Sequence, residues 1–344
     1  MEREELKLLQ LRNQHLLFPA DVLKAVRELC GMQAQFLSNA LHAIAIRSGA
    51  PAATDGLVKS WAMRGTMHVF AEADLPLILH EGRAHFLRPC DTLLDDAYCT
   101  AARKRELTGL ILRCIDAGIC ERDALKEALF AEGMSDEEAR SAFDPWGGLI
   151  RALCEKGEIC HIVQEKKAYR RCPSFTPMEK EEAQLELARR YFTHYGPATI
   201  KDAAYFFAVP QKTVRAWLDA LPVKSEECGG RTYFYVENGG ASQKELPDCI
   251  LLAGFDPLLM GYEKTESLYL QQENLRTVFT LSGIVRPTVL LRGEIAAVWK
   301  RMNKTLELTP FRPLTEEEYN AISDEAERLW AEGMRIKPTN HNLA

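Results

Sequence analysis

Two segments of the chain repeat the same order of secondary-structure signals, and this repetition constrains the fold most strongly. In residues 103–172, apolar residues recur at helical spacing in three successive stretches, and a glycine follows each stretch. The spacing then changes to two over residues 158–163 and 168–172, which is typical of a β-hairpin. Three helices followed by a hairpin form a winged helix, with the third helix as recognition element and the hairpin as wing.

The same order recurs in residues 179–236. A long first helix is predicted over residues 179–195 and is broken by Gly196-Pro197. Thr199 is suited to cap the second helix, a third is expected over residues 211–221, and a hairpin follows it. This second copy strengthens the prediction of tandem units.

A less regular copy lies upstream. We predict helices over residues 20–30 and 55–63, a short helix after Gln35, and a strand over residues 66–70. Three copies at irregular spacing indicate tandem winged helices and exclude a regular solenoid.

After residue 248 the pattern changes to strands. We predict a buried strand over residues 249–253, a loop over 254–261, strands over 283–291 and 294–299, and a helix over 316–334. The expected fold class is α+β, with three tandem winged-helix units followed by a β-rich domain. The predicted domains are residues 1–102 with a helical connection from 71, then 103–176, 177–244, and 245–344.

The composition is that of an ordinary globular protein. Of the 344 residues, 47% are hydrophobic and 27% are charged. No apolar run approaches the ~20 residues of a membrane span, and the acidic start Met-Glu-Arg-Glu-Glu differs from a signal peptide. We therefore expect a cytoplasmic protein that does not associate with membranes.

Ten cysteines suggest a metal site until their spacing is considered. None forms a C-x-x-C pair or has a histidine at zinc-finger spacing, although Cys160 and His161 are adjacent. We expect reduced thiols in apolar positions and no metal. The chain also lacks a Walker A sequence, G-x-G-x-x-G and H-E-x-x-H, so no nucleotide cofactor or catalytic metal is expected.

The net charge of −6 argues against nucleic-acid binding, although clustering matters more than the total. Four cations crowd the wing predicted in the unit 103–176, opposed there by Glu165: Lys166, Lys167, Arg170 and Arg171. A solvated hairpin tip is the alternative interpretation. Because the cations lie on a wing, we favour contact with DNA phosphates.

Two short motifs are candidates for a site. Gln33 and Gln35 flank Ala34 at a helix entrance, where two idle solvated glutamines are the simplest explanation. Arg64 and His68 occur around a predicted helix end and strand, where the ordinary interpretation is a glycine stop and a half-buried histidine. In a functional interpretation, Arg64 and His68 line a pocket beside the glutamines.

Four sequence blocks resemble the AlkZ/YcaQ-like family of bacterial winged-helix DNA glycosylases, in order along nearly the whole chain. They are Gly31-Met32-Gln33-Ala34-Gln35, Trp61-Ala62-Met63-Arg64-Gly65-Thr66-Met67-His68-Val69, Leu252-Ala253-Gly254-Phe255-Asp256-Pro257-Leu258-Leu259-Met260-Gly261-Tyr262, and Gly283-Ile284-Val285-Arg286-Pro287-Thr288-Val289-Leu290.

The resemblance implies tandem winged helices in a C-shaped arrangement around DNA. It also implies excision of N-alkylated purines, including bulky adducts and interstrand crosslinks. Gln33 and Gln35 match the family's motif of Gln, an aliphatic residue, then Gln or Asp, whereas Phe36-Leu37 replace the Asp-Pro expected next. The implied partner is double-stranded DNA carrying alkylated purines, bound by a monomer that is nucleoid-associated when on DNA.

Glutamines suit this chemistry. An N7- or N3-alkylated purine is already cationic, so it leaves without a strong general acid. The reaction then depends on placing a water against the oxocarbenium-like sugar, and a side-chain amide holds water with its oxygen while its NH2 is satisfied elsewhere. Residues i and i+2 point to different faces of a helix. Both glutamines therefore reach one lesion only if this entrance is non-helical, or if one supports the other from behind.

The hypothesis is a monofunctional alkylpurine DNA glycosylase in which Gln33 and Gln35 position the water, while Arg64 and His68 contact lesion or phosphate. One alternative is a non-catalytic DNA-binding regulator, a dimer on operator DNA in which the glutamines are bystanders. A protein-interaction module, favoured by the acidic balance, is the other.

Overall fold

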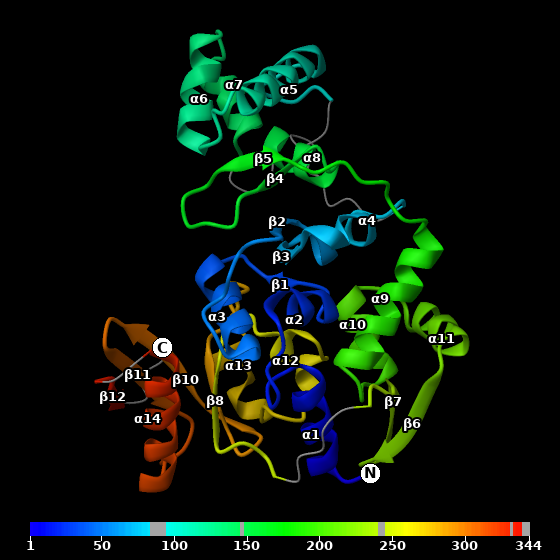
Figure 1. Cartoon of the computed structure of the whole chain (residues 1–344), viewed down its shortest axis with the longest axis vertical. Helices are drawn as coiled ribbons and strands as arrows, with labels where there is room; N and C mark the ends of the chain where they lie inside the picture. Colours follow the sequence, from blue (N-terminus) through cyan, green and yellow to red (C-terminus); the bar gives the residue numbers. More distant parts are fainter. Residues whose placement is uncertain (83–93, 145–147, 240–244, 331–332, 339–344) are drawn as a thin grey trace. The chain divides into compact units, whose positions relative to one another are not determined.

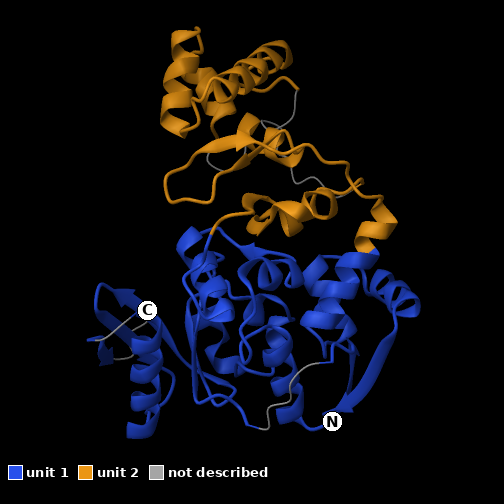
Figure 2. Cartoon of the chain, in the orientation of Figure 1, with its two compact units in different colours: residues 1–53, 185–344 blue, residues 54–184 orange. Residues whose placement is uncertain are grey.

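The computed structural model describes residues 1–82, 94–144, 148–239, 245–330 and 333–338. The fold combines helices and strands, as the α+β prediction requires (Figure 1). The chain divides into two compact units, Thr54–Gln184 and a second made of Met1–Ala53 with Leu185–Ala344 (Figure 2). Helix α9 (Lys180–His194) runs through the second boundary between them. None of the described helices has the length and apolar character needed to cross a bilayer.

Four strands of the unit Thr54–Gln184 form an antiparallel array in the order β3-β2-β4-β5. They are β2 (Leu57–Trp61), β3 (Met67–Ala71), β4 (Ile159–His161) and β5 (Tyr169–Arg171). Both strands of the predicted wing are confirmed, and the wing continues a larger sheet through the pair Lys59 and His161.

The helix predicted over residues 55–63 is wrong, because Leu57–Trp61 is strand β2. This stretch contains a β-branched and an aromatic residue, and it pairs along its length with β3, which confirms the strand predicted at 66–70. The 3-10 helix η1 (Met63–Gly65) joins the two strands. Tertiary pairing thus outweighed a weak helical pattern.

Four helices of this unit pack around one apolar core that includes Leu107, Leu125 and Leu153. They are α5 (Ala101–Asp116), α6 (Arg122–Ala131), α7 (Asp136–Ala142) and α8 (Gly148–Glu155). The short helices η2 (Glu72–Asp74) and α4 (Leu75–Ile78) follow strand β3. Helix α7 was not predicted, because it is short and polar, although Ser135 and Glu138 form a capping box at its start. Part of the predicted connection 71–102 (residues 83–93) and the predicted start of the third helix (145–147) lie outside the described residues.

The other unit begins with α1 (Arg3–Asn13), α2 (Val22–Glu28), the two-residue strand β1 (Met32–Gln33) and α3 (Leu37–Ser48). Helix α3 has 12 residues, so it is longer than the short helix expected after Gln35. Gly49 ends it with a left-handed φ of 68°.

The predicted elements of residues 179–236 are confirmed. They are α9, α10 (Ile200–Phe207), α11 (Gln211–Ala220), β6 (Val223–Cys228) and β7 (Arg231–Val236). Thr199 caps α10 as expected, by accepting a hydrogen bond from the Asp202 amide. The tandem winged-helix description and its domain boundaries remain our interpretation.

The C-terminal sheet has five strands in the order β12-β11-β10-β9-β8, with only β11 and β12 parallel. The strands are β8 (Cys249–Leu252), β9 (Thr288–Leu291), β10 (Glu294–Met302), β11 (Thr305–Pro310) and β12 (Arg335–Pro338). Helix α14 (Glu316–Trp330) buries Ile322 and Ala326 against this sheet.

Several details of this region differ from the prediction. The strand predicted at 283–291 is regular only from Thr288, and β11 and β12 were not predicted. Helix α14 ends before Met334, and the predicted loop 254–261 contains the short helix α12 (Pro257–Met260). The remaining short helices are η4 (Lys264–Glu266), η5 (Gln272–Asn274) and α13 (Leu275–Val278).

Candidate active site

The segment that carries both glutamines leaves helix α2 through two left-handed residues. Cys30 has φ 58° and Gly31 has φ 92°, and the Gly31 amide donates to the Val26 carbonyl at 2.8 Å. The chain then enters β1 and stays non-helical until α3 begins at Leu37. The entrance is therefore non-helical, which satisfies one of the two conditions under which Gln33 and Gln35 serve one site.

The two glutamines differ in exposure. Gln33 is 8% exposed and lies between Met32 and Ala34, which are 0% and 2% exposed. Gln35 is exposed to solvent. The backbone is thus anchored by apolar neighbours, with one amide held inside and the other available to a ligand. This arrangement fits a supporting role for Gln33 and a contacting role for Gln35.

A buried ion pair fixes helix α3, which follows the glutamines. The guanidinium of Arg47 donates to both carboxylate oxygens of Asp256, at 2.7 and 3.0 Å, and both side chains are 0% exposed. Asp256 also accepts from the Leu258 amide at 2.9 Å and so caps α12. The pair joins two helices that lie more than 200 residues apart in the chain, and sequence reasoning had not identified it.

Two neighbours of Asp256 complete this support. A β-carbon on Gly254 would lie 2.6 Å from Nδ2 of Asn39 in α3 and 2.9 Å from the backbone carbonyl oxygen of Val285, which cannot turn aside as a side chain can, so the position favours glycine. The ring of Phe255 lies 6.1 Å from the ring of Phe36, which directly follows Gln35 and is 48% exposed. The sequence block around Gly254 therefore supports the start and the body of α3.

The end of the same block holds helix α2 through α9. The Tyr262 hydroxyl donates to the Tyr195 carbonyl at 2.7 Å, and the Tyr191 hydroxyl donates to the Gly261 carbonyl at 2.8 Å. The Tyr195 hydroxyl in turn donates to the Leu29 carbonyl at 3.0 Å, one residue before the left-handed turn. Both ends of the glutamine segment are therefore attached to the block 252–262.

Arg64 and His68 belong to the other compact unit. Arg64 is half-buried with φ 57°. His68 is 2% exposed, its Nδ1 lies 3.0 Å from the Thr66 carbonyl, and burial together with the nearby Arg64 charge lowers its pKa to about 3. A neutral, buried imidazole shapes the turn between β2 and β3, and it offers no positive charge to a phosphate.

The four wing cations differ in their partners. Arg171 pairs with Asp116 at 3.0 Å, Arg170 pairs with Glu72, and Lys166 pairs with Glu121. Lys167 is exposed and makes no ion pair within the described part of the chain. A DNA phosphate would therefore have to displace a carboxylate from Lys166, Arg170 or Arg171. These carboxylates also balance most of the positive charge of the hairpin.

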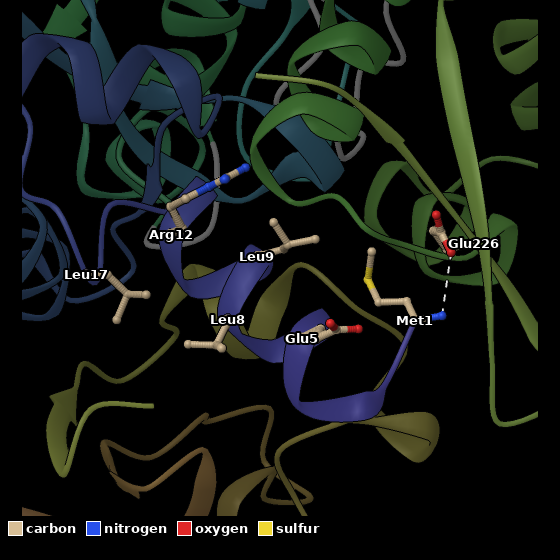
Figure 3. Close-up of a pocket in the computed structure, with 7 residues that line it drawn as sticks. All are labelled: Met1, Glu5, Leu8, Leu9, Arg12, Leu17 and Glu226. Atoms are coloured by element: carbon tan, nitrogen blue, oxygen red, sulfur yellow. Dashed lines mark ion pairs between the residues drawn. The ribbon is translucent and has the colours of Figure 1, made fainter. Parts of the chain in front are cut away.

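A well-formed hollow of about 340 Å³ lies on the α1 side of the larger unit (Figure 3). Leu8, Leu9 and Leu17 make it apolar, and the amino group of Met1 lies 3.5 Å from Glu226 at its rim. Neither Gln33 nor Gln35 lines this hollow. Its lining lacks an amide side chain that could position water, so we do not assign it to catalysis.

Comparison with known proteins identifies the class. The family model of the AlkZ-like DNA glycosylases matches residues 26–331, which is most of the chain. The chain therefore belongs to this family of DNA repair enzymes, and it is a DNA glycosylase.

One curated relative and one solved structure are similar over almost the whole chain. An interstrand DNA cross-link repair glycosylase from Streptomyces sahachiroi is 28% identical over 330 residues, which cover 88% of both chains. The structure of the Streptomyces sahachiroi DNA glycosylase AlkZ superimposes with a TM-score of 0.75, at 23% identity, covering 98% of this chain and 99% of that one. The shared fold extends over nearly the whole of both chains.

Proposed function

We propose that the protein hydrolyses the N-glycosidic bond of N-alkylated purines in double-stranded DNA, with N7-alkylguanine as the model substrate. Gln35 contacts the attacking water or the lesion, and Gln33 supports it from behind. The observation that carries this assignment is the non-helical segment after Gly31, in which Gln33 is buried and Gln35 is exposed.

The chemistry needs position more than acid strength. Because an N7-alkylated purine is cationic, its departure needs no proton from the enzyme, and the barrier lies in the sugar cation and the water that attacks it. An amide holds that water without titrating, so its action is independent of pH in the neutral range. Oriented dipoles in a fixed backbone provide the remaining electrostatic stabilisation.

Bulky adducts and interstrand crosslinks are further proposed substrates. The curated relative is named for cross-link repair. The exposed position of Gln35 supports this extension, because an amide at the surface reaches a large adduct that a closed base pocket would exclude. In this proposal the protein acts as a monomer on chromosomal DNA in the cytoplasm. Its exposed cations, above all Lys167, contact the DNA phosphates.

The direct experiment uses duplex DNA that carries one N7-methylguanine. The protein is incubated with this duplex in EDTA, and abasic sites are then cleaved with alkali. We expect strand breaks at the lesion alone. EDTA should not prevent them, because Gln33 and Gln35 are proposed to act without a metal. An unmodified duplex of the same sequence is the control. A third duplex carries an interstrand crosslink. If an excess of protein leaves both the N7-methylguanine duplex and the crosslinked duplex intact, the result would contradict the proposal and favour a non-catalytic DNA binder.

A further inference from the structure

Three side chains of types that commonly bind metals come together in the larger unit, although His194 lies far from the other two in the sequence. Nε2 of His15 lies 2.5 Å from Oε2 of Glu28, and Nδ1 of His194 lies 3.5 Å from the same oxygen. All three ligand atoms lie within 4.8 Å of one another. We propose that His15, Glu28 and His194 bind a divalent cation of the zinc type.

The backbone brings the three residues together from separate elements. Glu28 is the last residue of α2, His194 is the last residue of α9, and His15 follows α1 with a left-handed φ of 60°. Ligand atoms around tetrahedral zinc lie roughly 3.4 Å apart, as follows from bond lengths near 2.0–2.2 Å. The separations of 2.5 and 3.5 Å from the Glu28 oxygen, with all three atoms within 4.8 Å, lie around this value.

The donor types match the ion. Two imidazole nitrogens and one carboxylate oxygen suit zinc and its neighbours in the first transition series, whereas magnesium and calcium prefer oxygen ligands alone. Three protein ligands leave a fourth position for water, and Glu28 and His194 line a hollow of about 480 Å³ that has room for it.

The ring of His194 has a backbone contact that metal binding would change. Its Nδ1 lies 3.3 Å from the Asn13 carbonyl. Metal binding would release that contact and move the ring proton to Nε2.

Positive charges nearby set a limit on affinity. Lys24, Arg27, Arg189 and Arg190 line the same hollow, against the carboxylates of Asp21, Glu28 and Glu186. Arg189 and Arg190 are both bound to Glu186, at 2.6 and 2.8 Å, which offsets their repulsion of a cation. The remaining positive charge favours an anionic fourth ligand such as hydroxide or chloride.

The site has a structural consequence for the glutamine segment. Glu28 precedes the left-handed residues Cys30 and Gly31, which aim the chain into β1. An ion held by His15 and His194 would attach this end of α2 to the ends of α1 and α9. Its role is to stiffen the segment that carries Gln33, and it takes no part in the hydrolysis.

Cobalt substitution tests the site directly in the full-length protein after chelator treatment. We expect one equivalent of Co²⁺ to give visible d–d absorption without a thiolate charge-transfer band, because all three ligands are nitrogen or oxygen. Zn²⁺ should displace it, and its affinity is measured by competition with a chromophoric chelator. Removal of a group that merely orients a ligand typically costs 10–100-fold in metal affinity, so loss of a ligand itself in His194→Gln or His15→Gln should cost about 100-fold or more.

The controls separate loss of a ligand from loss of the fold. Glu186→Gln alters a carboxylate of the same hollow that is outside the site. Because this change releases Arg189 and Arg190 beside the site, it should lower zinc affinity, but by less than about 10-fold and far less than the loss of a ligand. His15→Cys should retain Co²⁺ and gain a thiolate charge-transfer band. If the wild-type protein binds neither ion, or binds it only through cysteine, the proposal is overturned. Wild-type affinity in the His15→Gln and His194→Gln variants would overturn it as well.

Discussion

The glutamine segment and the cationic hairpin use opposite means of holding functional side chains. Residues 30–36 are fixed by buried contacts, since Arg47 and Asp256 are fully enclosed and the tyrosine hydroxyls reach backbone carbonyls. On the hairpin β4–β5, the cations are partly or fully exposed and mostly engaged by carboxylates. Groups that must position a water need a rigid interior, whereas groups that meet any DNA sequence need charges that exchange partners easily.

The largest expected effect is on the buried pair. Arg47→Met leaves the Asp256 carboxylate enclosed without its partner, and it should lower the free energy of unfolding by about 3–5 kcal/mol. Arg171→Met breaks the exposed pair with Asp116 and should cost less than about 1 kcal/mol. Urea titrations of both variants measure the difference. Similar decreases in the two variants would contradict the contrast between an interior support and a surface support.

The double variant Arg47→Met/Asp256→Leu sharpens this result. Replacing both charges with apolar groups removes the unpaired carboxylate, so stability should rise above that of Arg47→Met. It should stay about 1 kcal/mol below wild type, because Asp256 no longer caps α12. If the double variant is as unstable as Arg47→Met, the pair itself, and not the unpaired charge, determines the cost.

Acid should destabilise the unit Thr54–Gln184 more than the larger unit. Burial is the main cause that lowers the pKa of His68 and of His161 to about 3, and neither ring nitrogen of His161 has a hydrogen-bond partner among the described residues. As the pH falls, both imidazole rings are therefore protonated in the unfolded chain before they are protonated in the folded protein. The contribution of the two neutral rings to the free energy of unfolding is fully present above pH ~6.5. It falls as the pH drops toward 3, by up to about 1.4 kcal/mol per pH unit for each histidine.

Hydrogen exchange at pH 7 and pH 5.5, corrected for intrinsic rates, measures this difference. The larger unit contains one strongly depressed histidine among its described residues, His194, whose pKa is about 4, so its protection should decline less steeply. His161→Phe should flatten the pH dependence of the smaller unit. An unchanged slope in that variant would show that His161 does not remain neutral in the fold.

A smaller effect is expected from the wing. Lys166→Glu/Lys167→Glu should weaken binding to every duplex equally and reduce the slope of log K against log[salt] by about 0.9 for each phosphate that the wing no longer neutralises. Because Lys166 already pairs with Glu121, we expect the reduction to come mainly from Lys167. The matched control is Lys224→Glu on the hairpin β6–β7, where Lys224 pairs with Glu237 at 2.7 Å. Equal slopes for wing variant and wild type would mean that this hairpin faces away from DNA.

The smallest effect concerns base recognition by α11. Lys212 and Arg215 are exposed on this helix, and a sequence-specific regulator would use such residues to distinguish bases. A repair enzyme must accept any sequence around a lesion, so Lys212→Ala/Arg215→Ala should leave the preference among undamaged duplexes unchanged. Fluorescence titrations on several duplexes measure it. A strong wild-type preference that disappears in this variant would favour the regulator.

The sequence predicted those parts of the molecule that depend on neighbouring residues. Helices α9 to α11, the hairpin β4–β5 and the cap at Thr199 follow from local periodicity and turn chemistry. Strand β2 was mistaken for a helix because its identity depends on pairing with β3 and β4.

For the candidate site, Gln33 and Gln35 were selected from the sequence, but their support was not. Arg47 meets Asp256 across 209 positions, and no local pattern reveals such a pair. The same is true of His15, Glu28 and His194. The block Leu252–Tyr262 was noted as a family signature, and the structure shows that it supports helices α2 and α3. The partners of the wing cations also required coordinates, because their carboxylates lie on other elements.

The central claim is that a rigid backbone presents Gln35 to a reacting water, and single-turnover excision of N7-methylguanine tests it most directly. Gln35→Ala should slow excision by about 100-fold or more, as expected for removal of one positioning group, while DNA affinity and the unfolding transition stay close to wild type. Gln33→Ala should slow it in the same way. Unchanged excision rates in both variants, with binding intact, would remove the two glutamines from the mechanism.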